Sequence, residues 1–420
     1  MSVQALPFGT AQGWRYGLLG LPLAFVALPL YVVLPNHYAR DFAVPLSALG
    51  GLLLAVRLLD AAMDPWIGRW CDRLFARSPA AVLRAGGWAA AVLAAAFALL
   101  FFPPLRGTAA LLAWAAAALV VTSLAFSVLA IAHQAWGAML GGDETQRSRI
   151  VAWREGCGLA GVLLASVLPL LAGLGPTAAV LAIALVIGCI AWRRAPQPQP
   201  QPHGGAGSWQ LPLRQQAFRR LLAVFLLNGV AAAVPATLVL FFVQDRLQAP
   251  PAMAPLFLAA YFLSAAAAIP LWLALVRLVG LARTWLAGML LAVAAFAGAA
   301  LLAGGDAWPF LVVCVLSGAA LGTDLALPGA LLAGTIAAAG HRGRAEGAYF
   351  GWWNFAGKLN LALAAGLSLP LLGLAGYRPG TADPEALRAL ALAYTVLPCV
   401  LKLAAAALLW HSMIRKETLP

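Results

Sequence analysis

The sequence carries little charge. Charged residues make up only 10% of the 420 residues, hydrophobic residues make up 63%, and the mean hydropathy is +0.89. Soluble domains contain about 45–50% apolar residues, so this composition indicates a membrane protein. Apolar runs of about 20 residues can cross a bilayer as helices, and they recur along the chain. We expect twelve spans, at 15–37, 46–68, 85–104, 109–140, 150–173, 176–192, 218–242, 253–276, 284–303, 308–339, 347–374 and 385–411.

Signals for several other classes are missing. The five cysteines are scattered and form no CxxC spacing, which favours neither structural disulfides nor a metal site. The sequence contains no HExxH or DxD motif at a membrane–water boundary. We therefore expect neither an enzyme nor a bound cofactor. The first apolar run is long and is followed by PNHYARDF rather than by small residues, so no cleaved signal peptide is predicted.

The net charge of +13 reflects membrane topology rather than nucleic-acid binding. If the N-terminus is cytoplasmic, nineteen of the 27 Lys and Arg residues fall on the cytoplasmic side, five on the other side and three within spans. This asymmetry follows the positive-inside rule. It predicts a protein of the cytoplasmic (inner) membrane of bacterial type, with both termini in the cytoplasm. The expected partners are the lipid bilayer and a small-molecule substrate, without nucleic acid, and we expect a monomer.

One composition change divides the chain. Residues 193–214, RRAPQPQPQPHGGAGSWQLPLR, alternate Pro with Gln and then become Gly-rich, as in an extended or flexible linker. Six expected spans precede this segment and six follow it. We therefore predict an N-terminal six-helix bundle at 1–194, a cytoplasmic loop at 195–214 and a C-terminal six-helix bundle at 215–420. Two helical halves joined in this way are typical of secondary transporters.

The second span contains a pair of acids. The stretch RLLDAAMDPWIGRWCDR places Asp60 and Asp64 four residues apart on one helix face, with Arg57 one turn earlier. An intramembrane charge costs about 2.5–3.5 kcal/mol, and two neighbouring carboxylates repel unless a cation lies between them. The pair therefore predicts a site for Na⁺ or H⁺. The alternative is a static salt-bridge cluster that holds this helix to its neighbours.

The end of the same span contains Gly68, Asp72 and Arg73 in GRWCDR. The spacing G-x-x-x-D-R between the second and third spans resembles the loop motif of the major facilitator superfamily. In that superfamily the glycine permits close helix approach and the Asp–Arg pair latches the halves in one state, which implies a gating role for these three residues. A solvated loop end is the alternative.

Three segments together give a more specific resemblance. RLLDAAMDPWIGRWCDR, HQAWGAMLGGDETQRSRIVAWREG (133–156) and HRGRAEGAYFGWWNFAGKLNLALAAGLSLPLLGLAGY (341–377) resemble signatures of the glycoside–pentoside–hexuronide:cation symporters, the melibiose permease family. The resemblance implies the twelve-helix major facilitator fold. It also implies that Asp60 and Asp64 bind the cation, with Arg57 beside them.

The same resemblance implies two cationic cavity residues. Arg154 would be the fifth-helix arginine near the substrate, although it could simply mark the cytoplasmic interface. Lys358 would be the eleventh-helix lysine that faces the cavity. Its mid-span position supports this assignment, and the alternative is a lysine that snorkels to the membrane surface.

The sequence also departs from the family pattern. The sugar permeases carry an aspartate in the first helix and another in the fourth. Here the first span has no acid, and the fourth has His133 and Gln134 instead. Met63 replaces an asparagine between the paired acids. Na⁺ requires several hard oxygen ligands, whereas a proton requires only a suitable carboxylate, so we favour H⁺ over Na⁺ as the coupling ion, without a resident metal.

Four more polar or aromatic residues are cavity candidates. His133 and Gln134 could contact substrate, or His133 could be a hydrogen-bonded inter-helix residue. Asp324 is a lone mid-span acid that could pair with Lys358 or Lys402, and Trp353 could form an aromatic platform or only pack. The sequence predicts a cation-coupled symporter of a small organic solute, such as a sugar or glycoside, that works by alternating access. The alternative is a carrier of lipid or another amphiphile with the same fold.

Overall fold

The protein is helical throughout its described residues. The structure is a computed structural model that describes residues 8–198, 208–250 and 253–415. Within these ranges it contains no strand. The chain forms two compact units, residues 1–214 with 333–355, and residues 215–332 with 356–420. Part of the expected central loop, residues 199–207, lies outside the described residues.

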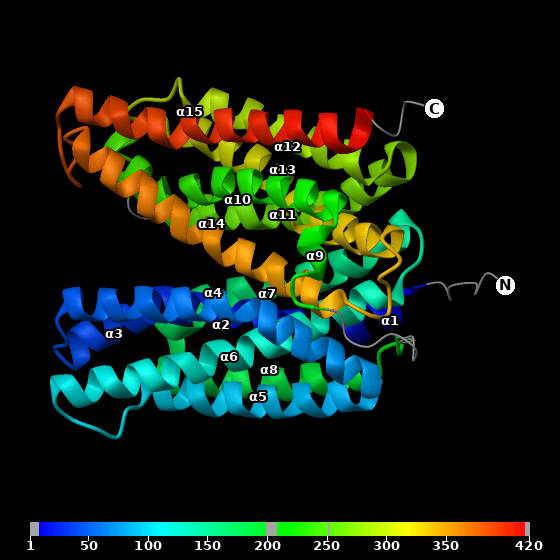
Figure 1. The fold of residues 1–420 in the computed structure, drawn as a ribbon. Helices are drawn as coiled ribbons and strands as arrows, with labels where there is room; N and C mark the ends of the chain where they lie inside the picture. The colour runs from blue at the N-terminus through cyan, green and yellow to red at the C-terminus, as the bar shows by residue number, and fades with distance from the viewer. Residues whose placement is uncertain (1–7, 199–207, 251–252, 416–420) are drawn as a thin grey trace. The chain divides into compact units, whose positions relative to one another are not determined.

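The first unit consists mainly of helices from the first half of the chain. Figure 1 shows α5, α6 and α8 running side by side, and α5 packs against both of the others. Ser78 caps the start of α5 by accepting a hydrogen bond from the Ala81 amide at 3.1 Å, as an N-cap side chain does. The helices are α1 (Thr10–Gly17), α2 (Gly20–Leu28), α3 (Leu34–Asp41), α4 (Leu46–Arg77), α5 (Pro79–Phe101), α6 (Thr108–Leu140), α7 (Glu144–Ala172), α8 (Leu174–Arg193) and the short α9 (Leu211–Arg214).

The first expected span is interrupted. A short π-helix (η1, Pro29–Val33) separates α2 from α3, and Leu18 and Leu19 separate α1 from α2. Proline has no amide hydrogen to donate to the preceding turn, and Pro29 is the first residue of the π-helix. The sequence predicts one span over 15–37. Pro29 accounts for the change of helix type within that span, but not for the separation of α1 from α2.

Small residues let the helices of the first unit approach closely. A side chain at Gly161 of α7 would meet the carbonyl oxygen of Leu21 in α2, and one at Gly20 of α2 would meet the carbonyl oxygen of Arg154 in α7. Glycine at such positions brings backbones together, which is a common basis of helix association in membranes. These contacts position the start of α7.

The second unit is built around α15. This helix packs against α10 and α12, and all three run side by side in Figure 1. The second unit contains most of α13 (Ala307–Ala338) and of α14 (Glu346–Leu374). Its other elements are α10 (Gln216–Phe241), α11 (Met253–Val279), α12 (Leu281–Ala299) and α15 (Pro384–Leu409), with the π-helices η2 (Phe242–Arg246) and η3 (Trp410–Ile414).

The segment 333–355 groups with the first unit. It comprises the end of α13, the following loop and the start of α14. The boundary expected from the sequence leaves it in the second half. Its contacts explain the grouping, since Arg342 donates to the carbonyl of Met139 at 3.2 Å and the Gly347 amide donates to Asp72 at 2.6 Å.

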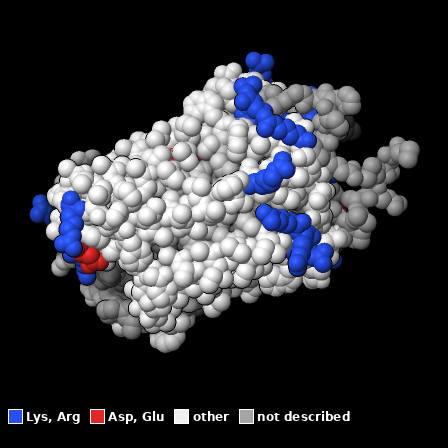
Figure 2. Space-filling model, turned by 90° about the horizontal axis from the view of Figure 1, so that it is seen from below, with Lys and Arg blue, Asp and Glu red and all other residues white. Residues whose placement is uncertain are grey.

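The helices suit a membrane. Ten of the helices that the structure describes are long and apolar enough to cross a bilayer. The remaining two expected spans are α4, which carries Arg57, Asp60 and Asp64, and the interrupted first span. All twelve expected spans thus coincide with a helix or a consecutive series of helices. On the face shown in Figure 2, Lys and Arg gather near the helix ends and the surface between them is almost uncharged. The prediction of an all-α membrane protein is confirmed.

Candidate functional site

The paired acids of α4 lie inside the first unit. Asp60 is 7% exposed and Asp64 is fully buried. Their four-residue spacing places them on the same helix face, with Cβ atoms about 5–6 Å apart. Arg57, one turn earlier, is exposed. The arrangement can bind a proton or a small cation, because a buried negative charge is stabilised by either.

A hydroxyl group from another helix joins this pair. Ser127 of α6 is buried and donates its hydroxyl hydrogen to Asp60 Oδ1 at 3.1 Å. The fourth span lacks an acid, and we had no expectation for this serine. A polar residue within the otherwise apolar stretch LAFSVLAIA is the sequence signal that could have identified it.

His133 connects α6 to α1. It is fully buried, and its Nε2 lies 2.8 Å from the carbonyl oxygen of Tyr16. The carbonyl only accepts, so Nε2 carries the proton. Tyr16 donates its hydroxyl to the His133 carbonyl at 3.1 Å, and the two rings stack with centroids 4.4 Å apart. These contacts fix the histidine between two helices, and a role in substrate binding stays a prediction.

Gln134 and Arg154 have different polar partners. Gln134 accepts a hydrogen bond from Asn354 at 2.6 Å. Arg154 donates from Nε to Glu155 at 2.9 Å, and its side chain is 12% exposed. The glutamate compensates the arginine charge inside the first unit. The structure therefore shows Arg154 in a partly buried ion pair with its neighbour Glu155.

Asp72, near the end of α4, contacts the first turn of α14 through its side chain. Its carboxylate accepts hydrogen bonds from the amides of Gly347 at 2.6 Å and Ala348 at 2.9 Å. The first amides of a helix have no partner within the helix and carry partial positive charge, so this carboxylate satisfies and stabilises them. Gly68 faces Gly347 so closely that a side chain on either would meet the other's carbonyl oxygen. Arg73 is exposed.

Two aromatic or cationic candidates lie farther along α14. Trp353 is 8% exposed and belongs to the first unit. Lys358 is half-buried and belongs to the second unit. Their roles as cavity residues stay predictions.

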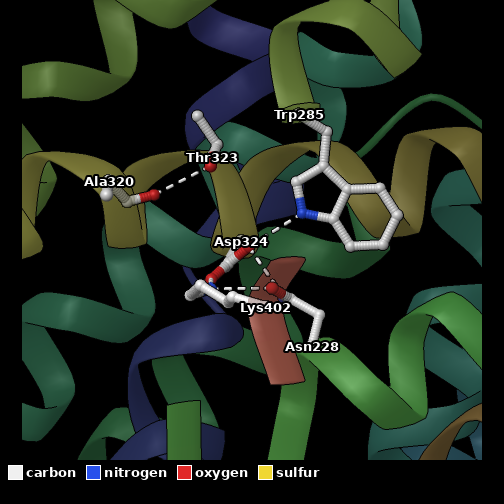
Figure 3. Close-up of polar contacts among 6 residues, drawn as sticks. All are labelled: Asn228, Trp285, Ala320, Thr323, Asp324 and Lys402. Atoms are coloured by element: carbon white, nitrogen blue, oxygen red, sulfur yellow. Dashed lines mark hydrogen bonds and ion pairs between the residues drawn. The ribbon is translucent and has the colours of Figure 1, made fainter. Parts of the chain in front are cut away.

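The second unit contains its own buried ion pair. Lys402 of α15 donates to Asp324 Oδ2 of α13 at 2.9 Å. Of the two partners left open by the sequence for this aspartate, the structure therefore shows Lys402. The other oxygen of Asp324 accepts from Asn228 at 2.9 Å and from Trp285 at 2.8 Å. Figure 3 shows these side chains converging on the carboxylate from separate helices.

Lys402 is a residue that sequence reasoning did not assign to a site. It is 4% exposed and also donates to Asn228 Oδ1 at 2.7 Å. A lysine inside the apolar stretch VLPCVLKLAAAALL was the available signal. Among the described residues, no group of three His, Cys, Asp or Glu could hold a metal ion.

Comparison of the sequence with known protein families identifies one family. A sequence profile described as MFS/sugar transport protein matches residues 15–416. No curated protein sequence matches the chain significantly.

Solved structures with the same fold include transporters of several kinds. A bacterial homologue of the iron transporter ferroportin, in an outward-facing state, superposes with a TM-score of 0.68 at 17% identity, covering 96% of this chain and 100% of its own. The human organic anion transporter TETRAN gives 0.66 at 17% identity, with 96% and 100% covered. The E. coli fucose:proton symporter gives 0.65 at 14% identity, with 93% and 98% covered. At these identities the likeness shows the fold alone.

Proposed function

Because the chain belongs to the family of MFS/sugar transport proteins and has the major facilitator fold, we propose that it couples solute uptake to a cation. Membership makes it a membrane transporter. The proposal adds that it is a symporter of a small organic solute such as a sugar or glycoside. A fold neighbour described as a fucose:proton symporter is an example of such coupled transport on this fold.

The observation that carries the proposal is the burial of two carboxylates on one face of α4. Asp60 and Asp64 are almost inaccessible, and Ser127 donates to the first of them. Two carboxylates that lie close together repel each other, and a proton or a cation bound between them relieves this repulsion. A site whose negative charge falls when the ion binds can make the conformational change depend on the ion.

We favour H⁺ over Na⁺ at this site. Na⁺ needs several hard oxygen ligands, and the residue between the two acids is Met63, whose thioether is a poor ligand for it. A proton requires no further oxygen. Ser127 adds one hydroxyl, which suits a protonated carboxyl group as well as a carboxylate.

The working cycle that we propose is alternating access. The outward-facing protein loads a proton at Asp60 and Asp64 and then the solute. The bound proton reduces the negative charge of the pair and so lowers the cost of carrying charge through the membrane. The protein then changes to the inward-facing state, and the proton and the solute are released to the cytoplasm. Asp72, with Gly68 and Arg73, would stabilise the state closed on the cytoplasmic side. In this scheme the protein lies in the inner membrane with both termini cytoplasmic and acts as a monomer.

The test is uptake by proteoliposomes. A panel of labelled sugars and glycosides is offered with an inward proton gradient, with a Na⁺ gradient, or with neither. We expect uptake only with the proton gradient, and its loss in Asp64→Asn. Asp41→Asn is the matched control, because that side chain is 61% exposed. Proton-driven uptake by Asp64→Asn at the wild-type rate would show that the acid pair does not bind the coupling cation. Uptake with a Na⁺ gradient alone that equals uptake with the proton gradient would contradict the preference for H⁺.

A second candidate is a carrier of amphiphiles. The second unit contains a cavity of about 230 Å³ with many aromatic residues in its wall, and the first span lacks an acid for sugar hydroxyls. An amphiphile carrier would show uptake that soluble sugars do not inhibit, which the same proteoliposome assay detects.

A further inference from the structure

The second unit contains a mainly apolar cavity. Its volume is about 230 Å³, and its wall is formed by α10, α11, α12, α13 and α15, all within this unit. A dry cavity of about 150 Å³ in another protein binds benzene, so this one admits a molecule with more than one ring. Five aromatic side chains contribute to the wall: Phe257, Tyr261, Phe262, Phe296 and Tyr394.

One part of the wall is charged. Asp324 and Lys402, the ion pair shown in Figure 3, both line the cavity. A lysine ammonium group has three donors, and here one bonds Asp324 and another bonds Asn228. One N–H of Lys402 is therefore left to bond an oxygen atom of a molecule in the cavity.

Two phenol groups add to this polar part. Tyr261 and Tyr394 line the cavity, and the hydroxyl group of neither bonds to a described residue. Tyr394 is only 4% exposed. The hydroxyl groups of buried tyrosines usually have a hydrogen-bond partner. Both are therefore available to a ligand that offers an oxygen or a hydroxyl group.

The charge of the wall limits the charge of the ligand. Asp324 and Lys402 neutralise each other, and Asn228 and Trp285 complete the bonding of the carboxylate. A charged ligand would leave an uncompensated charge inside the unit, which is costly. An uncharged molecule with an apolar body and one oxygen fits without this cost.

We infer that this cavity binds an uncharged amphiphile whose body is about the size of two fused aromatic rings and whose oxygen accepts a hydrogen bond from Lys402. The binding site stands on the cavity and the ion pair alone. The further statement that the occupant is the transported solute rests on the proposed function. It gives that solute an apolar part, as in a glycoside with an aromatic aglycone, rather than hydroxyl groups throughout.

Binding is tested on the full chain in nanodiscs with labelled 1-naphthol, which is uncharged near neutral pH. Empty nanodiscs correct for partition into lipid, and saturable binding displaced by unlabelled 1-naphthol is measured. Naphthalene has the same rings without the oxygen and is expected to bind about tenfold more weakly, because it lacks one hydrogen bond to a charged group. Sorbitol, which is polar throughout, is expected not to compete.

Two kinds of variant locate the site. Ala236→Phe adds a ring at an exposed alanine of the cavity wall and is expected to weaken 1-naphthol binding at least tenfold. Ala294→Phe makes the same change at an exposed alanine of α12 outside that wall and is expected to bind as wild type. The double variant Asp324→Asn/Lys402→Met removes both charges together and is expected to weaken 1-naphthol about tenfold without changing naphthalene.

The outcomes separate this inference from the proposed function. Absence of saturable 1-naphthol binding to wild type, or unchanged binding in both Ala236→Phe and the double variant, would overturn the inference. The double variant keeps the test open if Ala236→Phe does not fold. Binding requires no ion gradient, so Asp64→Asn is expected to bind 1-naphthol normally while failing to drive uptake. Normal binding with no coupled uptake by wild type would overturn the proposed function and leave the site in place.

Discussion

The carboxylate of Asp72 accepts a hydrogen bond from the amide of Gly347 at 2.6 Å, although 275 residues separate them in the sequence. The contact brings the C-terminal end of α4 to the first turn of α14. It gives the G-x-x-x-D-R stretch a physical partner that the sequence could not supply.

Replacing Asp72 with alanine should destabilise the protein. The substitution leaves the buried amides of Gly347 and Ala348 without a partner, which costs about 1–3 kcal/mol for each buried group left unsatisfied. We expect a lower melting temperature in detergent. Arg73→Ala changes an exposed neighbour and should melt close to wild type. Equal melting temperatures for the two variants would contradict the contact.

A methyl group at Gly68 should also be destabilising. It would meet the carbonyl oxygen of Gly347, and overpacking of this kind costs about 1–3 kcal/mol. Gly51→Ala makes the same change in the same helix, where an added side chain meets nothing within 4 Å. That control should gain about 0.5–1 kcal/mol, because alanine favours a helix more than glycine. The melting temperatures of the two variants should therefore move in opposite directions.

Replacing Lys402 alone should destabilise the protein more than replacing Lys402 and Asp324 together. Lys402→Met leaves the carboxylate of Asp324, which is 15% exposed, without its cation, and breaking a pair that is fully buried costs about 3–5 kcal/mol, which is the upper limit here. Adding Asp324→Asn should restore most of the lost stability, since replacing both charges is often neutral. Thermal unfolding of the two single variants and the double variant forms the test. Additive losses would show that the two residues do not depend on each other.

Acid should reduce stability through His341. Burial and the neighbouring Arg344 lower the pKa of this histidine in the loop before α14, and its Nδ1 lies 2.8 Å from the Tyr349 hydroxyl oxygen. A lowered folded-state pKa means that the unfolded chain binds the proton more readily. The contribution of His341 is therefore present above about pH 6.5, the usual pKa of histidine, and is lost as the pH falls below it. The melting temperature of His341→Gln should fall less steeply than that of wild type as the pH is lowered below about 6.5. An equally steep fall would show that other groups cause the acid sensitivity.

The sequence predicted the helices well because spanning a bilayer depends on local hydropathy. All twelve expected spans have helical counterparts. It also predicted that Asp60 and Asp64 share one face of a helix, since their spacing determines this. Their role in binding a cation stays a prediction. The interruption at Pro29 was missed because hydropathy does not register the loss of a single backbone donor.

The contacts between helices could not be predicted in the same way. Asp324 had two candidate lysines, and only the three-dimensional structure, in which the Lys402 side chain of α15 reaches its carboxylate, selects Lys402, which is 78 residues away. Ser127 likewise gains significance only from the approach of α6 to α4. These partners depend on which helices are neighbours, and spacing along one helix contains no such information.

The assignment of 333–355 to the first unit bears on how the chain can be divided. The backbone passes between the units after Arg214, after Leu332 and after Phe355, so the central loop is only one of three covalent connections. Proteolysis confined to that loop would leave one uncut polypeptide, residues 215–420, contributing to both units. A fragment ending at Arg214 would lack the amides that bind Asp72. The sequence halves therefore do not coincide with the two compact units, and complementation experiments should co-express them.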